Sequence, residues 1–160
     1  MPKKKIGFTI GKYAPLHKGH QLVIETAIKE MDEVYCVIYD TDLICCDIET
    51  RAGWLKKLYP NIKIIYAFDS PKQYGLDKES VEIQMNYLSN LVKMIPVTHF
   101  YSSELYGEKV AQYLNIENRL VDLERKLIPI YANDIRFDLE KNKKYLEKFI
   151  YDDLKKDSII

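Results

Sequence analysis

Short apolar runs alternate with amphipathic segments along this chain of 160 residues. Runs rich in β-branched and aromatic residues are typical of buried strands, whereas apolar residues spaced three and four apart predict helices. The pattern predicts strands over residues 5–10, 34–39, 62–68, 99–101 and 119–122. It predicts helices over residues 20–31, 48–59, 78–94 and 103–114, a short helix from residue 132 or 133, and a charged helix over residues 142–154.

Strands that alternate with helices indicate an α/β fold with a parallel sheet of about five strands, because each parallel crossover needs a covering helix. We expect helices on both faces of that sheet. The sequence has no internal repeat and no evident linker, so we expect a single domain over residues 1–160 with a frayed tail at about 155–160. Ligands of such sheets bind at the carboxyl ends of the strands, so chemistry is expected in the loops after the first and fifth strands.

Composition narrows the class of protein. Twenty-four Lys and Arg residues balance 24 Asp and Glu residues, and the pI is about 6.8, which argues against nucleic acid as a partner but leaves room for a local anion site. Cys36, Cys45 and Cys46 are odd in number and do not fit a disulfide framework. The apolar stretch behind the basic N-terminus stops at Gly11, too short for a signal peptide or a membrane span, so we expect a cytoplasmic protein without a membrane partner.

The loop after the first strand carries His17-Lys18-Gly19-His20. Two histidines three apart at a helix start face the same volume, and the intervening glycine lets a ligand approach the backbone. The helix N-terminus offers free N–H groups and a partial positive charge, to which Lys12 adds a full charge, so the loop predicts a phosphate site. A surface histidine pair and a partial zinc site are the alternatives. Zinc needs three or four ligands, which the adjacent Cys45 and Cys46 complement poorly, so no metal site is predicted.

The run from Gly11 to His20 (Gly-Lys-Tyr-Ala-Pro-Leu-His-Lys-Gly-His) resembles the signature of the HxGH nucleotidyltransferase superfamily. Over roughly residues 5–150 the chain resembles the adenylyltransferase domain of the bacterial bifunctional nicotinamide-nucleotide adenylyltransferase/ribosylnicotinamide kinase. Residues 101–104 (Tyr-Ser-Ser-Glu) resemble its Tyr-Thr-Ser-Glu stretch, and residues 121–136 resemble the segment that carries its second signature, Ile-Ser-x-x-x-Ile-Arg. The resemblance implies a Rossmann-like nucleotidyltransferase fold and an enzyme that forms NAD and pyrophosphate from ATP and nicotinamide mononucleotide.

The resemblance also implies roles for individual residues. Catalysis would fall to His17, His20, Lys12 and Arg136, with Arg136 holding the β- and γ-phosphates. The nucleotide would be bound by Gly11, Tyr13, Gly19, Ser102, Ser103, Glu104, Arg125, Ile130, Tyr131, Ala132 and Asn133. The acceptor would be bound by Asp40, Arg51, Tyr74 and Asp77. A magnesium ion would arrive with the triphosphate, the partners would be small nucleotides, and the oligomeric state, a homo-oligomer included, stays open.

Three arginines have a second interpretation. Arg136 has the alternative of a solvated residue on a charged helix, and Arg51 that of a residue without function near a helix start. Arg125 has two candidate partners, the carboxylate of Asp122 and a phosphate of the ligand. Trp54 has helical spacing with Leu58 and is predicted to be a core residue.

Two departures from the family pattern leave the substrate open. Tyr131 and Asn133 stand where the second signature has Ser and often Thr; Tyr131 would stack on a base or block the site, and Asn133 can cap the helix. Residues 75–79 (Gly-Leu-Asp-Lys-Glu) stand where the family has a Gly-Trp-Asp-x-Trp stretch, and Tyr74 is the candidate substitute for the two missing tryptophans. The alternatives are therefore a cytidylyltransferase or adenylyltransferase for another phosphate or phosphonate acceptor, and a nucleotide-binding sensor or regulatory module. No Gly-x-x-x-x-Gly-Lys-[Ser/Thr] motif occurs, so no kinase activity is expected.

Overall fold

The computed structural model describes residues 3–72, 75 and 77–157. Within these ranges five parallel strands form a sheet of order β3-β2-β1-β4-β5. The strands are β1 (Ile6–Gly11), β2 (Glu33–Tyr39), β3 (Lys63–Ala67), β4 (His99–Ser102) and β5 (Glu117–Leu120). The helices are α1 (Lys18–Glu30), α2 (Ile48–Leu58), α3 (Lys78–Val92), α4 (Tyr106–Leu114), α5 (Ala132–Phe137), α6 (Leu139–Asn142) and α7 (Lys148–Asp157). The predicted α/β fold with a five-stranded parallel sheet is confirmed.

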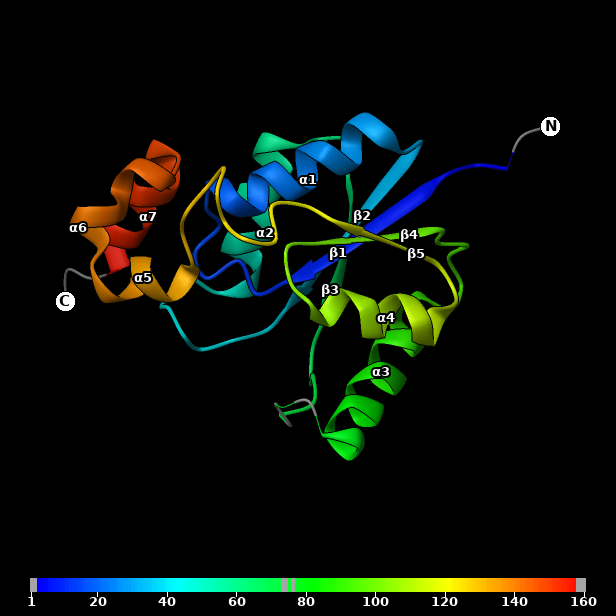
Figure 1. Cartoon of the computed structure of the whole chain (residues 1–160). Helices are drawn as coiled ribbons and strands as arrows, with labels where there is room; N and C mark the ends of the chain where they lie inside the picture. Colours follow the sequence, from blue (N-terminus) through cyan, green and yellow to red (C-terminus); the bar gives the residue numbers. More distant parts are fainter. Residues whose placement is uncertain (1–2, 73–74, 76, 158–160) are drawn as a thin grey trace.

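The sheet is covered on both faces, as predicted: α1 and α2 lie on one face and α3 and α4 on the other (Figure 1). Because successive strand residues point to opposite faces, Cys36 and Ile38 pack with the α1 and α2 layer whereas Val37 packs with the α3 and α4 layer. Phe8 and Phe100 stand side by side on that second face, with ring centroids 4.9 Å apart. Two apolar layers therefore hold the sheet rigid beneath its carboxyl ends.

The C-terminal helices α5, α6 and α7 gather at the end of the molecule toward which β1 points (Figure 1). They extend the α2 layer: Ile150 of α7 is fully buried in the same cluster as Trp54, which is 3% exposed, so the prediction of a core tryptophan is confirmed. The Trp54 indole N–H donates to Asp153 over 2.7 Å, and Lys18 at the start of α1 pairs with Glu147. These contacts attach the C-terminal segment to α2 and to the start of α1, which follows the loop after β1.

Some predicted boundaries are wrong, for local reasons. The fifth strand covers residues 117–120 rather than 119–122, because the chain turns at Asp122, whose φ is 51°. The helix expected from residue 103 begins at Tyr106, because the Ser102 hydroxyl and the backbone of Glu104 bond each other in a turn. The helix expected over residues 142–154 is divided into α6, a 3₁₀ turn over residues 143–145 and α7. Residues 155–157 are helical rather than frayed, and 158–160 lie outside the described residues.

Two expectations from composition can be compared with the structure. Cys36 and Cys46 are buried and Cys45 is exposed, and all three are free thiols in the structure. Among the helices of the described ranges, none has the length and apolar character needed to cross a bilayer.

Candidate functional site

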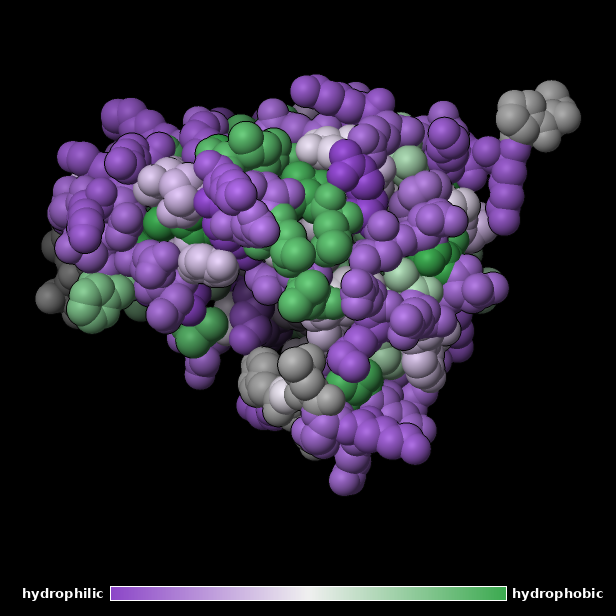
Figure 2. All heavy atoms as spheres, viewed as in Figure 1, coloured by the Kyte–Doolittle hydropathy of each residue, from purple (hydrophilic) through white to green (hydrophobic). Residues whose placement is uncertain are grey.

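A cavity of about 240 Å³ opens at the switch in strand order, where β1 and β4 lie side by side. The chain leaves β1 for α1 on one face and leaves β4 for α4 on the other, so the two loops diverge and leave a crevice between them. Figure 2 shows a recess in the surface near the point where β1 ends in Figure 1. The cavity is lined by Thr9, Ile10, Gly11, Tyr13, His17, Gly19, His20, Val23, Ile24, Ser102, Ser103, Glu104, Arg125, Tyr131 and Ala132.

The two predicted histidines meet at the start of α1. Tyr13 and Leu16 are buried in the core beneath α1, which anchors the loop and places His17 at the N-cap position. The His17 Nδ1 accepts the backbone N–H groups of Gly19 (3.0 Å) and His20 (3.4 Å), and the His20 Nδ1 accepts the N–H of His17 (3.1 Å). The two rings stack, with centroids 3.8 Å apart and planes 28° apart. The prediction that the pair faces one small volume is confirmed.

The hydrogen bonds assign a tautomer to both rings. Because each Nδ1 accepts a hydrogen bond, the proton of each neutral imidazole belongs on Nε2. Burial, with a smaller contribution from the charge of Arg125, lowers the pKa of His17 to about 3. Burial, then His17 and Arg125, lowers the pKa of His20 well below its usual value. At neutral pH the cavity is therefore lined by two uncharged rings that each carry an Nε2–H donor.

The glycine between the histidines is required by the His17 ring. A Cβ atom on Gly19 would lie 2.8 Å from Cε1 and 3.0 Å from Nδ1 of His17, closer than real side chains pack. An alanine at this position would push the capping imidazole out of place. The spacing His-x-Gly-His is thus the local solution that lets one histidine cap the helix while a second one stacks on it.

Arg125 supplies the positive charge of the opposite wall. Its guanidinium donates from Nη2 to Glu104 over 2.8 Å and lies 4.4 Å from the centroid of the Tyr131 ring. Its Nε is buried and has no hydrogen-bond partner within the protein. A guanidinium with an unsatisfied buried donor is the kind of group that a phosphate oxygen would complete.

Asp122 builds the loop that brings Arg125 to the cavity. Its carboxylate accepts the backbone N–H groups of Lys126 (2.8 Å), Leu127 (3.0 Å) and Ile128 (3.0 Å), bonds that hold the pKa of Asp122 below its usual value. The interpretation that Arg125 forms an ion pair with Asp122 is therefore wrong. The Asp122 carboxylate accepts backbone N–H groups, and Arg125 forms its ion pair with Glu104.

Several predicted residues lie away from this cavity. Arg136 donates to the carbonyl of Ala14 over 2.7 Å and thereby holds the loop after β1 from outside. Ile130 is a core residue, 2% exposed. Asn133 does not cap α5: the N-cap is Tyr131, whose N–H donates to the Asp134 carboxylate over 3.2 Å. Tyr131, in contrast, lines the cavity, where it stacks on Arg125 and is half exposed.

Three of the predicted acceptor residues, Asp40, Arg51 and Asp77, also lie outside the cavity. Asp77 caps α3 through the N–H of Ser80, which is 3.1 Å from its carboxylate. Asp40 lies 3.7 Å from the guanidinium of Arg51, and Arg51 is fully buried. Lys12 lines a neighbouring cavity, and Tyr74 lies outside the described residues. Thr9, Ile10, Val23 and Ile24 line the cavity beside the histidines and were not predicted; the first two belong to β1, and the other two follow His20 by about one helical turn.

The described residues contain no group of three or more His, Cys, Asp or Glu side chains that could hold a metal ion. Among the described residues that line the histidine cavity, Glu104 carries the one carboxylate, and it is paired with Arg125. The donor set is therefore suited to anions.

Comparison with known proteins matches residues 7–158 to the citrate lyase ligase C-terminal domain. The trifunctional NAD biosynthesis/regulator protein NadR of Salmonella typhimurium is 29% identical over 153 residues, which are 84% of this chain and 37% of that protein. NadR of Escherichia coli is 27% identical over the same share of both chains. This chain thus spans little more than a third of the length of these curated relatives.

Solved structures share the fold. A bifunctional NMN adenylyltransferase/ADP ribose pyrophosphatase from Francisella tularensis superposes with a TM-score of 0.70 at 15% identity, over 96% of this chain and 49% of that one. A NadR protein in complex with NAD and AMP-PNP superposes with a TM-score of 0.64 at 23% identity, over 89% of this chain and 44% of that one. The predicted Rossmann-like nucleotidyltransferase fold and the distant similarity to NadR are confirmed.

Proposed function

The chain belongs to the citrate lyase ligase C-terminal domain family, and we propose that it transfers a nucleotidyl group from a nucleoside triphosphate to a small acceptor. The first substrate pair to test is ATP with nicotinamide mononucleotide, which would give NAD and pyrophosphate. The names of the NadR relatives and of the NMN adenylyltransferase structure support this pair. The observation that carries the proposal is the pair of stacked, neutral imidazoles that present Nε2–H donors to one cavity beside Arg125.

In nucleotidyl transfer the protein mainly positions the two substrates and stabilises the charge that develops on the phosphate oxygens. A phosphate oxygen of the acceptor attacks the α-phosphorus of the triphosphate in line; the new O–P bond forms as the bond to the β-phosphate bridge breaks, and pyrophosphate leaves with the electron pair. Neutral Nε2–H donors of His17 and His20 would bond the phosphate oxygens on which charge grows in the transition state. The N-terminal N–H groups of α1 and the guanidinium of Arg125 would add positive potential on either side.

Magnesium belongs to the substrate in this proposal. The ion would enter as the complex with the triphosphate and keep phosphate and water ligands, as Mg²⁺ commonly does. The protein would then orient the complex through the histidine pair and Arg125.

A screen of pyrophosphate release tests the proposal. Purified protein is incubated with Mg²⁺, with ATP or CTP, and with a panel of acceptors that includes nicotinamide mononucleotide and simple phosphate and phosphonate esters. We expect acceptor-dependent release of pyrophosphate. Release with nicotinamide mononucleotide would support the adenylyltransferase, and release with CTP or another acceptor would support the second enzyme candidate, which the missing tryptophans before α3 favour.

A nucleotide sensor is the candidate of a different class, and one observation favours it. In this structure Arg125 forms an ion pair with Glu104 and stacks on Tyr131. A triphosphate that binds Arg125 would have to separate it from these two side chains, which would reduce the net binding energy. Tight ATP binding without turnover on any acceptor would support the sensor, and an increase in turnover in Tyr131→Ser would show that the phenol limits catalysis.

A further inference from the structure

The two edges of the sheet differ in how well they are protected. Within the described part of the sheet, β3 and β5 each have one neighbouring strand, which leaves the backbone groups on their outer side without a partner strand. The β5 edge is charged: it contains Glu117 and Arg119, and the Arg119 guanidinium donates to the carbonyl of Leu120 over 2.7 Å. The β3 edge is apolar, since Lys63 is the one charged residue in its sequence Lys-Ile-Ile-Tyr-Ala. Charged side chains commonly protect an edge from pairing, so β3 is the edge that is open to another strand.

The hydrogen bonds of β3 indicate which of its residues face outward. The carbonyl of Ala67 accepts the N–H of Asp40 over 3.2 Å, so the backbone of Ala67 faces β2. Backbone groups alternate in direction along a strand, which turns Ile65 toward β2 as well and turns Ile64 and Tyr66 outward. Two outward residues separated by one inward residue are able to donate to, and accept from, an identical strand that runs antiparallel.

A two-fold axis at Ile65 produces this antiparallel pairing. It places Ile64 of each copy opposite Tyr66 of the other, and a β-branched residue opposite an aromatic one is a favourable cross-strand pair. It also places Lys63 opposite Ala67, so that like charges do not meet. The strand is therefore complementary to a second copy of itself.

Helix α2 borders this edge with a charged face that is also complementary to itself. Tyr66 identifies that face, because its hydroxyl lies 3.0 Å from the Lys56 ammonium and 3.4 Å from the Glu49 carboxylate. Glu49 is in the first turn of α2 and Lys56 is in the last, and both residues are exposed. The axis at Ile65 sets the α2 helices of two copies antiparallel. The acidic end of each face then lies beside the basic end of the other.

Gly53 lies between these two charges, in the middle of α2. The spacing of four and three residues places Glu49, Gly53 and Lys56 on one side of the helix. Glycine is among the least favourable residues inside a helix, and a Cβ atom on Gly53 would meet no described atom within 4 Å, so the packing of the chain itself does not require a glycine here. A glycine does allow a second backbone to approach closely, which is what two crossing α2 helices need.

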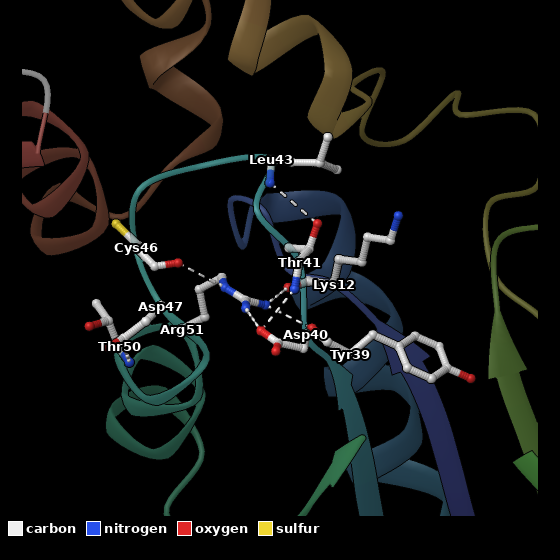
Figure 3. A network of polar contacts seen from close by, with 9 residues as sticks. All are labelled: Lys12, Tyr39, Asp40, Thr41, Leu43, Cys46, Asp47, Thr50 and Arg51. Atoms are coloured by element: carbon white, nitrogen blue, oxygen red, sulfur yellow. Dashed lines mark hydrogen bonds and ion pairs between the residues drawn. The ribbon is translucent and has the colours of Figure 1, made fainter. Parts of the chain in front are cut away.

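The rest of the molecule holds this surface in place. On the inner side of α2, Arg51 is fully buried and donates to the carbonyls of Tyr39 (3.0 Å) and Cys46 (3.1 Å). Figure 3 shows this guanidinium extending from α2 toward Tyr39 at the end of β2, so the helix is fixed to the strand beside β3. Directly after β3, Phe68 is 52% exposed and its ring stacks on Tyr66, with centroids 6.0 Å apart and planes 7° apart. Side chains that are already ordered lose little conformational freedom when a partner covers them.

We propose that this protein forms a two-fold dimer through the β3 edge and the outer face of α2, so that the sheets of two copies join into one continuous sheet. The contacts come from Ile64, Tyr66 and Phe68 at the strand and from Glu49, Gly53 and Lys56 on the helix. The histidine cavity lies between β1 and β4, and β2 separates it from this edge. The dimer therefore leaves both cavities open, and the inference does not depend on the proposed function.

Sedimentation velocity over a range of protein concentrations tests the dimer. We expect the wild type to sediment with twice the 18.9 kDa mass of the chain. Gly53→Arg places two like charges and two long side chains at the crossing of the α2 helices, and we expect it to raise the dissociation constant of the dimer at least about tenfold. The monomer has space for the new side chain, so the circular dichroism spectrum should not change. Gln112→Arg is the matched control, because Gln112 is an exposed residue of α4, the helix that precedes the opposite edge strand, and it should leave the dimer intact.

Exchanging charges tests whether the partner is a second copy. Glu49→Lys and Lys56→Glu each place like charges opposite one another at symmetric positions, so we expect either variant alone to weaken the dimer about tenfold. In an equimolar mixture of the two variants, each chain meets the opposite charge on the other. The mixture should therefore form heterodimers with an affinity close to that of the wild-type dimer.

Amide hydrogen exchange measured by NMR tests the pairing of the strands. In the wild-type dimer the outward N–H groups of Ile64 and Tyr66 should exchange slowly, and in Gly53→Arg they should exchange fast. The N–H of Ile65 faces β2 and should be protected in both proteins.

Four results would each overturn the proposal. The first is a wild-type protein that stays monomeric at every soluble concentration, which would leave the β3 edge free for some other partner or for none. The second is a dimer that Gly53→Arg does not weaken. The third is a pair of charge variants that mixing does not rescue, and the fourth is fast exchange of the Ile64 and Tyr66 N–H groups in the wild-type dimer.

Discussion

Replacing His17 by asparagine and by alanine separates two tasks that one imidazole performs. The Nδ1 atom caps α1 by accepting the N–H groups of Gly19 and His20, at 3.0 and 3.4 Å. The Nε2–H is the donor that we propose acts on the triphosphate. An asparagine side chain offers a carbonyl oxygen that can cap the helix but has no donor in the place of Nε2–H, and alanine offers neither.

The structure sets the expected magnitudes. Loss of an N-cap typically costs about 0.5–2 kcal/mol, and His17, which is 3% exposed, would also leave a small void. We therefore expect His17→Ala to lower the free energy of unfolding by about 2 kcal/mol, and His17→Asn to lower it by less than about 1 kcal/mol. Loss of one transition-state donor typically reduces kcat by about 10²–10³-fold, which we expect for both variants.

Two assays on the same preparations separate the capping role of His17 from its proposed catalytic role. Urea unfolding followed by circular dichroism gives the stability difference, and pyrophosphate release at saturating substrate gives kcat. A His17→Asn variant with the turnover of the wild type would refute the proposed role of Nε2–H. A His17→Ala variant as stable as the wild type would refute the capping role.

Three further predictions follow from the same geometry. Because the pKa of His17 is about 3 in the folded chain and near 6.5 when unfolded, the stability it confers is fully present above about pH 6.5 and is lost as the pH falls toward 3. In urea unfolding at several pH values, the wild type should therefore lose about 1 kcal/mol more than His17→Asn between pH 6 and pH 5; equal losses would contradict a buried neutral ring. Gly19→Ala, whose Cβ would stand 2.8 Å from Cε1 of His17, should lower kcat about 10²-fold, and an unchanged kcat would show that the ring tolerates displacement. Arg125→Met should raise the KM for ATP by at least about tenfold, whereas Arg136→Met, which loses a contact to a loop carbonyl, should raise it less; the reverse order would restore Arg136 as the phosphate ligand.

The parts of the site that could be predicted from the sequence are local. The histidine pair was predictable because both members lie within one helical turn, so the spacing alone places their side chains together. The order and type of the first ten elements, from β1 to α5, were likewise predictable apart from their exact ends, because they depend on apolar periodicity that each segment carries in its own residues.

The remaining parts depend on contacts that leave no pattern in the sequence. Arg125 reaches the cavity because Asp122 folds the loop onto its own backbone, and its partner Glu104 is 21 residues away. Arg51 and Arg136 are held by carbonyl groups of Lys12 and Ala14, and every residue has a carbonyl, so no side chain marks them as partners.

The most direct test of the central claim is the rate of pyrophosphate release from ATP with nicotinamide mononucleotide, measured for the wild type and for His20→Ala after both are shown to be folded. We expect release that depends on the acceptor and matches the NAD formed, at a rate about 10²–10³-fold lower in the variant. Equal rates in the two proteins would contradict the claim that the stacked histidines are the catalytic centre.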